Sequence, residues 1–193
     1  MEGLVPEPTK RVAWVRQESL GDRQEAVAFR EEHFPPRPAS QPTAAVIDLN
    51  GMPTANVGRL RELVLPIAQG IRGGVYGQTV LSLSSTVDGF VDFANDLAIA
   101  NDVGFFWSAT SDDIREAKPL GDLSTTERET LGLVKAAGGE TTASELAARA
   151  DIEATAAGNR LVNLVRKGYL HRIDRPRRDG DLFVDPRSVD ATS

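Results

Sequence analysis

Basic side chains gather in one short stretch near the C-terminus of the sequence. Between Gly158 and Arg178 there are seven arginines and lysines but a single acid, Asp174, so these 21 residues carry a net charge of +6. The whole chain of 193 residues has a net charge of -6. A basic face in an otherwise acidic protein can attract phosphate groups while the remaining surface discourages indiscriminate binding. The charge pattern therefore predicts a phosphate-binding surface in the C-terminal part.

Other residue types that do chemistry are sparse. The chain has no cysteine and two histidines, His33 and His171, which lie far apart in sequence, so we expect no metal site. The polar segment Ser82–Asp88 lies where a strand is predicted to give way to a helix, a common ligand position in α/β folds. No histidine base accompanies its serines, so we expect no catalytic residues there. We favour capping of the following helix by Ser85 or Thr86.

Four glycines could suggest a phosphate loop: Gly70, Gly73, Gly74 and Gly77. They follow a predicted helix and precede a predicted strand, whereas nucleotide-binding loops have the opposite order, with backbone N–H groups at a helix start around the phosphate. Neither GxGxxG nor GxxxxGK[ST] occurs in the chain. We predict that these glycines form turns and that the protein uses no cofactor.

The first 110 residues alternate between short apolar runs and amphipathic stretches. Strands are predicted at 11–16, 44–49, 79–83 and 103–107, and helices at 22–33, 55–72 and 87–100. Prolines between Pro35 and Pro42 predict a semi-rigid connector. Strands separated by helices favour parallel crossovers. We therefore expect a small three-layer α/β domain with a mostly parallel sheet over residues 1–110, and a linker over residues 111–123.

One part of this domain is weakly similar to a known family. The run from Val46 to Met52 (VIDLNGM), followed by Gly58-Arg59-Leu60, resembles STAS-like domains, and the similarity spans about residues 44–108. Such domains are small α/β protein-interaction modules, and the regulators among them often carry a phosphorylatable serine before the helix glycine. Here Asn56 and Val57 occupy that position, so no phosphoserine switch is expected. The resemblance implies sensing, partner binding or dimerisation.

The C-terminal part has sharply marked helices. Ser124 to Glu127 and Thr142 to Glu145 both have the spacing of a capping box, in which a hydroxyl and a glutamate satisfy backbone N–H groups at a helix start. A third helix is predicted from about Glu153 to Lys167, where Gly168 ends it. Two strands follow, at 169–173 and 181–184. This order predicts a compact unit of three helices and a hairpin over residues 124–193.

This unit resembles the winged helix-turn-helix regulators of the broad MarR-like and ArsR-like class. The similarity is carried by Leu161 and Leu164, by Gly168, which ends the helix before Tyr169 and Leu170, and by the arginine-rich hairpin that follows. It covers about one third of the chain. The resemblance implies a recognition helix and a wing that bind double-stranded DNA.

The groove geometry of DNA gives each residue of this unit an expected role. A helix fits the major groove, so Thr155, Asn159, Arg160 and Asn163 are predicted to contact base edges. Four residues are predicted to contact phosphates, which position a protein without reading sequence: Arg166, Lys167, His171 and Arg172. The predicted wing tip adds Arg175, Arg177 and Arg178.

These observations predict a DNA-binding transcriptional regulator that is not an enzyme. We expect a homodimer, because a two-fold dimer presents two helices to two half-sites. The N-terminus lacks an export signal and no long apolar run occurs, so we expect a cytoplasmic protein away from membranes. The main alternative is a non-catalytic adaptor whose winged helix docks protein. A second is an enzyme acting at Ser82–Asp88.

Overall fold

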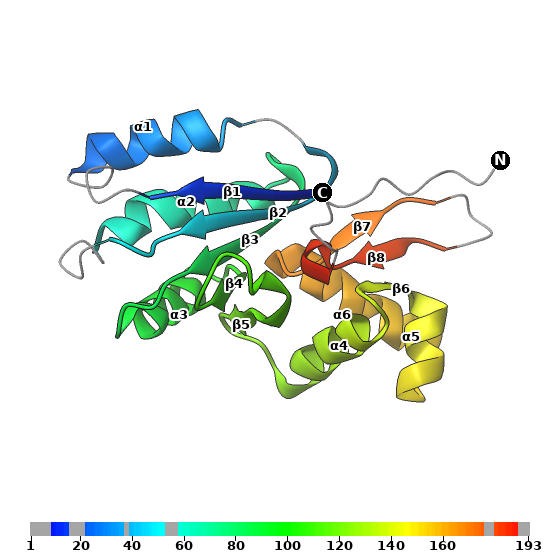
Figure 1. Cartoon of the computed structure of the whole chain (residues 1–193). Helices are drawn as coiled ribbons and strands as arrows, with labels where there is room; N and C mark the ends of the chain where they lie inside the picture. Colours follow the sequence, from blue (N-terminus) through cyan, green and yellow to red (C-terminus); the bar gives the residue numbers. More distant parts are fainter. Residues whose placement is uncertain (1–8, 16–21, 37–38, 53–57, 176–179, 189–193) are drawn as a thin grey trace.

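Five strands form the main sheet of the protein (Figure 1). A computed structural model describes residues 9–15, 22–36, 39–52, 58–175 and 180–188. The strands lie in sequence order: β1 (Thr9–Trp14), β2 (Ala39–Asp48), β3 (Gly77–Ser84), β4 (Phe105–Ser108) and β5 (Lys118–Leu120). Strands β1 to β4 are parallel, and β5 pairs antiparallel with β4. The predicted α/β class with a mostly parallel sheet is confirmed.

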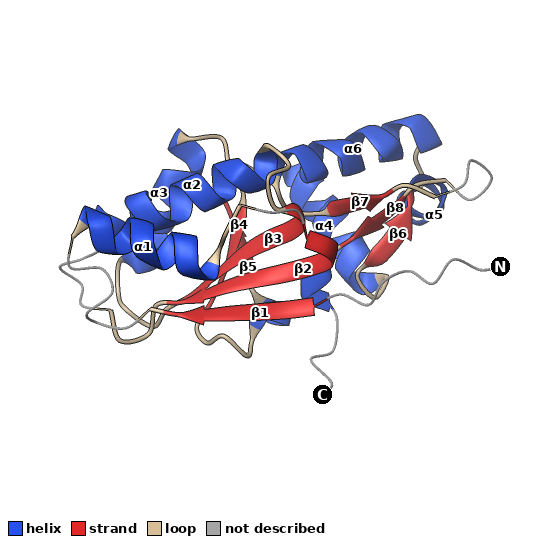
Figure 2. Ribbon diagram, turned by 90° about the horizontal axis from the view of Figure 1, so that it is seen from above, coloured by secondary structure: helices blue, strands red, loops and turns tan. Residues whose placement is uncertain are grey.

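Three helices cover one face of this sheet (Figure 2). They are α1 (Arg23–His33), α2 (Leu60–Arg72) and α3 (Phe90–Ala100). Crossovers between parallel strands are right-handed, so strands added in one direction leave every crossover helix on the same side. Because side chains alternate along a strand, Ala45 and Ile47 of β2 point toward these helices.

The opposite face of the sheet meets the C-terminal part of the chain. Ala44 and Val46 of β2, Val80 of β3 and Phe106 of β4 belong to a core that continues into the C-terminal helices. The predicted three-layer domain within residues 1–110 is therefore wrong. The first 110 residues supply two layers, because their strand order never reverses, and the C-terminal helices supply the third.

The C-terminal elements form a second unit with its own small sheet. They are α4 (Thr125–Ala136), β6 (Glu140–Thr142), α5 (Ala143–Ala150), α6 (Ala154–Lys167), β7 (His171–Ile173) and β8 (Leu182–Val184), with strand order β6-β8-β7 and antiparallel pairing. Both predicted capping boxes, at Ser124 and Thr142, are confirmed. The sequence did not predict β6, which is three residues long and pairs with β8.

Tyr169 is central to the contact between the two units. Its ring lies edge-on to that of Phe106, with 5.5 Å between centroids, and its hydroxyl donates a 2.6 Å hydrogen bond to the carbonyl of Leu120. Burial raises the pKa of Tyr169 above its usual value, so the hydroxyl remains a donor. A Cβ atom added to Gly104 would lie 2.3 Å from Cζ of Tyr169. The ring can occupy this position because residue 104 has no side chain.

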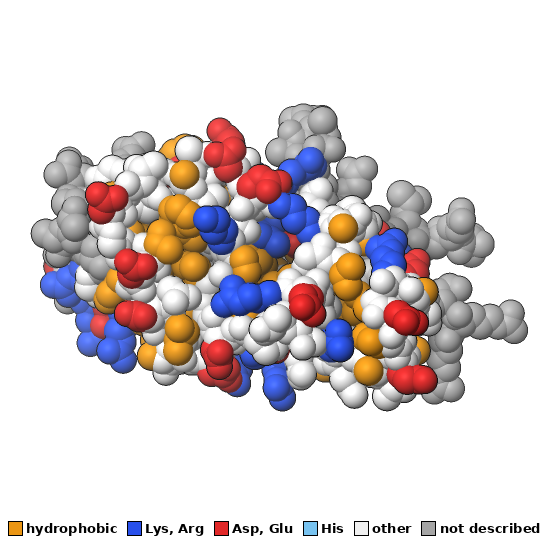
Figure 3. Space-filling model, turned by 90° about the horizontal axis from the view of Figure 1, so that it is seen from below, with side chains coloured by type: hydrophobic (Ala, Val, Ile, Leu, Met, Phe, Trp, Pro, Cys, Tyr) orange, Lys and Arg blue, Asp and Glu red, His pale blue; other side chains and the backbone are white. Residues whose placement is uncertain are grey.

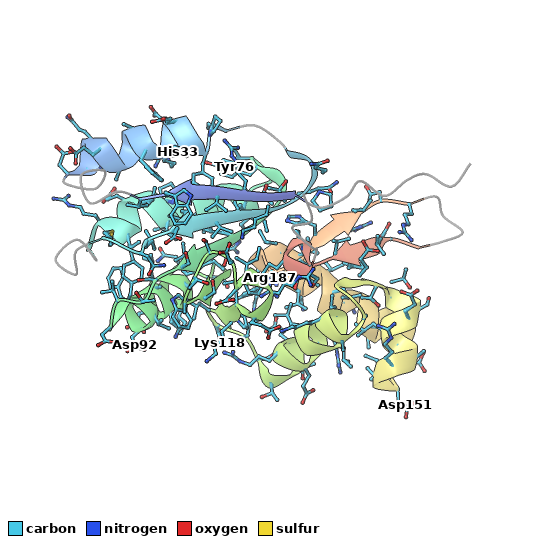
Figure 4. The ribbon with its side chains drawn as sticks, in the orientation of Figure 1. His33, Tyr76, Asp92, Lys118, Asp151 and Arg187 are labelled. Atoms are coloured by element: carbon cyan, nitrogen blue, oxygen red, sulfur yellow. The ribbon has the colours of Figure 1, made fainter. Side chains whose placement is uncertain are left out.

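The segment that the sequence predicts as a linker contributes to both units. Residues 111–123 contain the short helix η3 (Ile114–Glu116) and strand β5 at the sheet edge. Arg187 lies in the short helix η4 (Pro186–Ser188) and donates a hydrogen bond of 2.7 Å to the carbonyl of Ala117. It also donates to the carboxylate of Asp185. Its Cζ atom lies 3.3 Å from the centroid of the Phe106 ring. Figure 4 shows Arg187 between the main sheet and the C-terminal helices. The segment is part of the folded body.

Strand β2 begins earlier than its apolar run suggests. Ala39 already pairs with Gly77, and the register then shifts before Thr43 pairs with Thr79. Pro42 lies in this irregular part, where its missing N–H is tolerated. The predicted connector from Pro35 to Pro42 is therefore wrong over residues 39–42, which belong to the strand; residues 37 and 38 lie outside the described residues.

Candidate nucleic-acid interface

Helix α6 is the element that the sequence predicts to meet DNA. It buries Ala157, Leu161 and Leu164, whose spacings of four and three place them on one face, against α4 and α5. Gly168 ends the helix with φ of +92°, a left-handed conformation that favours glycine, and its N–H bonds to the Leu164 carbonyl. Figure 2 shows α6 at the margin of the molecule, with no labelled element beyond it. Its outer face is open to solvent.

Three of the four predicted base-reading residues share this outer face. Thr155, Asn159 and Asn163 are exposed and follow one another at intervals of four, so they form a stripe of hydrogen-bonding side chains along α6. Arg166 extends the stripe at the C-terminal end and is exposed, whereas Arg160, beside it, is half-buried. Thr155, Asn159, Asn163 and Arg166 thus share one side of the helix, whereas Arg160, one position after Asn159, lies off this stripe.

The sequence did not single out Val162, which lies within the same stripe. Its side chain is 44% exposed, one of four large apolar side chains in the described residues that are exposed. It follows Asn159 by three positions and precedes Arg166 by four, and that spacing is the signal that could have identified it. An exposed apolar group among polar ones can contact a thymine methyl.

Lys167 does not lie on this face. Its Nζ atom donates a hydrogen bond of 2.9 Å to Oε2 of Glu127 and one of 2.7 Å to the carbonyl of Asp122. These bonds connect α6 to the start of α4. Burial alone would raise the pKa of Glu127, but hydrogen bonds from Lys167 and Ser124 outweigh it and hold this pKa below its usual value. The predicted phosphate contact of Lys167 is not available in this arrangement.

His171 is also placed differently from the prediction. It begins β7 and is 7% exposed, packed toward Thr79 of β3. Burial lowers its pKa to about 4, although the Thr79 backbone and Asp185 act in the opposite direction. At neutral pH the imidazole is therefore uncharged and enclosed between the two units, so it offers no cation to an external phosphate. Strand alternation explains this, because the next residue, Arg172, is exposed.

Ion pairs on the β7–β8 hairpin reduce the basic charge that the sequence suggested. The Nε atom of Arg172 lies 3.2 Å from Oδ1 of Asp174, and its Nη2 atom lies 2.7 Å from Oδ2 of Asp181. Arg175 is half-buried, and the predicted wing-tip residues Arg177 and Arg178 lie outside the described residues. Within the described ranges, no acid lies within ion-pair distance of Arg160 or Arg166. These two arginines carry the unpaired charge of the α6 surface.

A second group of cations lies around the hollow between β5 and α4. Lys118, Arg128 and Lys135 line a hollow of about 330 Å³ whose wall includes Phe106 and Leu131. Figure 3 shows that acidic and basic side chains are interspersed on the face viewed from below. Lys135 itself pairs with Glu116 at 2.7 Å. This hollow has no continuous stripe of hydrogen-bonding side chains, so α6 is the stronger candidate interface.

Part of the polar segment at the end of β3 forms bonds within the fold, whereas the buried Oγ atoms of Ser82 and Ser84 have no hydrogen-bond partner in the described structure. Asn50 accepts hydrogen bonds from the N–H and hydroxyl of Thr86, both at 2.9 Å, and donates to the carbonyl of Ala109. Ser85 accepts from the N–H of Val87. The predicted capping of α3 by Ser85 or Thr86 is wrong, because α3 begins at Phe90 and its N-cap residue is Gly89. These side chains instead connect three loops at the carboxyl end of the sheet.

In the described ranges no three histidine, aspartate or glutamate side chains are grouped so that they could hold a metal ion. No helix of the described chain is long and apolar enough to cross a membrane. No protein-family model matches the sequence, and no curated protein matches it significantly. The outer face of α6 is therefore the feature of the described chain that most favours a function.

Proposed function

We propose that this protein binds duplex DNA through the outer face of α6 and acts as a transcriptional regulator. The observation that carries the proposal is the exposed stripe of hydrogen-bonding and cationic side chains on α6, alongside the β7–β8 hairpin. A helix of this kind fits the major groove, where each base pair presents its own pattern of donors and acceptors. The resemblance of residues 124–193 to winged helix-turn-helix regulators supports the same interpretation.

The proposal assigns different roles to different parts of the stripe. Asn159 and Asn163, with Thr155, hydrogen-bond to base edges, and Val162 contacts a thymine methyl. Arg160 and Arg166 neutralise phosphates, because no ion pair occupies them in the described part of the chain; Arg160, predicted from the sequence to contact base edges, takes this role because it lies off the stripe. The hairpin residues Arg175, Arg177 and Arg178 contact the adjacent backbone, whereas Arg172 is paired with Asp174 and Asp181. Lys167 and His171 are omitted, because both are engaged inside the fold.

Fluorescence anisotropy with a random-sequence duplex tests this function. Binding is expected to weaken as salt increases, and the slope of log K against log salt falls by about 0.9 for each phosphate contact removed. The double substitution Arg160→Gln and Arg166→Gln should lower the slope by about 2. Lys118→Gln, on β5, removes one positive charge at the hollow instead and should leave the slope unchanged.

Selection of preferred sequences then separates base reading from phosphate binding. Asn159→Ala should change the preferred sequence, whereas Arg177→Ala with Arg178→Ala should weaken binding to all sequences and lower its salt dependence. A protein that binds no duplex at low salt, yet forms a stable complex with another protein, would support the adaptor alternative. The expected homodimer is tested separately, by mass measurement with light scattering.

A further inference from the structure

Strand β1 forms a free edge of the main sheet. It pairs with β2 on one side, and Figure 2 shows no labelled helix or strand beyond it on the other. Proteins commonly protect such edges with proline or with charged side chains. β1 has the sequence TKRVAW and contains no proline. Its two basic side chains lie against the body of the protein: Lys10 donates to Asp112 at 3.2 Å, and Cζ of Arg11 lies 6.0 Å from the centroid of the Phe34 ring. The backbone of this edge is therefore left open.

The hydrogen bonding of β1 shows which backbone groups face outward. The N–H of Val15, directly after the strand, donates a hydrogen bond of 2.8 Å to the carbonyl of Asp48 in β2. Alternate residues of a strand point their backbone groups to the same side, so the odd-numbered residues of β1 turn toward β2. The N–H and C=O groups of Lys10, Val12 and Trp14 therefore point away from the sheet, and no backbone group of the described residues pairs with them.

An exposed tryptophan and an acidic hollow lie at the same edge. Trp14 is 61% exposed, the highest value among the large apolar side chains of the described residues. Beside it, Ala28 and Phe29 of α1 line a hollow of about 560 Å³ that also contains Glu25 and Glu32. Neither acid lies within ion-pair distance of a lysine or arginine in the described ranges. This surface favours a partner that offers an apolar group and a cation.

We propose that a second copy of the chain pairs with β1 in the antiparallel direction, about a two-fold axis at Val12. This register places Val12 opposite Val12 of the second copy and Lys10 opposite its Trp14. Each of these facing pairs exchanges two backbone hydrogen bonds, so all the outward N–H and C=O groups of Lys10, Val12 and Trp14 are satisfied. The main sheets of the two copies then form one continuous sheet without a free edge at β1.

The sequence of β1 favours this register over its neighbours. An axis at Arg11 would place two arginines directly opposite each other, which is destabilising, and would leave Trp14 without a pairing residue in β1. An axis at Ala13 would leave Lys10 without one. Only an axis at Val12 pairs every outward-facing residue of β1 within the strand.

The second copy also supplies the cation and the apolar group that the surface favours. Arg11 and Ala13 share the face of the sheet that α1 covers, so Arg11 lies opposite Ala13 of the second copy, at the hollow with the two unpaired acids. Arg11 is exposed and has no ion pair within the described ranges. On the other face, the aliphatic part of Lys10 packs on the exposed indole of Trp14. The two-fold axis repeats both contacts.

Sedimentation velocity of the DNA-free protein over a range of concentrations tests the interface. Val12→Pro removes an outward N–H and leaves the pairing with β2 intact, so it should weaken the dimer about tenfold or more. Trp14→Ser should weaken it too, whereas Ile99→Ser, which removes an exposed apolar side chain of α3, should not. A wild-type protein that is monomeric up to about 0.1 mM would overturn the inference, as would normal dimerisation of Val12→Pro.

Complementary charge reversals test whether a second copy occupies this register. Arg11→Glu should weaken self-association, and so should the double substitution Glu25→Lys with Glu32→Lys, because each places like charges together. Mixing the two variants should restore a dimer, since each residue 11 then meets opposite charges. Circular dichroism establishes that the variants are folded, because Glu25 also belongs to the capping box of α1. A mixture that remains monomeric would contradict the contact between Arg11 and the hollow.

The interface and the DNA-binding proposal are tested by separate measurements. Self-association is measured without DNA, and none of the substituted residues belongs to α6. If the protein dimerises through β1 and binds no duplex, the proposed function is wrong and the interface stands. If the protein binds duplex but remains a monomer, the interface is wrong and the proposed function stands.

Discussion

Lowering the pH from about 8 to about 5 is expected to reduce the free energy of unfolding by about 2 kcal/mol through His171 alone. The pKa of His171 is about 4 in the folded protein, against 6.5 for an exposed histidine. Because the folded-state pKa is lowered, the stabilising neutral form is fully effective above about pH 6.5, and its contribution is lost progressively as the pH falls toward about 4. The total loss over that window is about 3 kcal/mol.

Urea denaturation at a series of pH values measures this loss. The lowered pKa of Glu127 also favours the folded state, but that contribution is lost only as the pH falls below the usual range of a glutamate. Measurements above about pH 5 therefore isolate the histidine. In the His171→Gln variant most of the dependence of the unfolding free energy on pH should be lost. In the His33→Gln variant this dependence should remain. A His171 imidazole that titrates near pH 6.5 in the folded wild-type protein would refute the reasoning without any variant.

Two further predictions concern the contact between the units. Tyr169→Phe removes the donor to the Leu120 carbonyl and leaves it buried, so urea denaturation should show a loss of about 1–2 kcal/mol; an unchanged midpoint would mean that water replaces the hydroxyl. Gly104→Ala places a methyl group against the buried Tyr169 ring, which has no room to move aside. The substitution should lower the free energy of unfolding by about 2 kcal/mol or more. Gly132→Ala, on α4 with no atom within 4 Å, is the matched control and should be neutral or slightly stabilising; equal effects of the two substitutions would contradict the close approach.

Local signals predicted the helices of the C-terminal unit well. Ser124 and Thr142 open their helices with the expected capping boxes, and Gly168 ends α6 as expected. These features depend on residues within one turn of each other, so the sequence contains all the information needed. Strands β5 and β6 were missed because Lys118-Pro119-Leu120 contains a proline and Glu140-Thr141-Thr142 contains no apolar residue, so neither has the pattern of a strand. Both are defined by their partners, β4 and β8.

The candidate site was predicted only in part for a related reason. The spacing of Asn159 and Asn163 on a helix fixes a shared face, whatever the rest of the fold does. The accessibility of Lys167 and His171 depends instead on elements far away in the sequence, because Lys167 meets Glu127 of α4 within the C-terminal unit and His171 meets Thr79 of the first unit. A count of basic residues along the sequence cannot distinguish a cation facing solvent from one already engaged.

The shared core on the second face of the sheet limits how this chain can be divided. Cutting the chain after Leu123 would expose Val46, Val80 and Phe106 to water on the first fragment, and would leave Tyr169 without its pocket on the second. We therefore expect that neither fragment folds as a self-sufficient domain. Transplanted into another protein, the C-terminal unit should need a matching apolar sheet face and a glycine opposite its tyrosine.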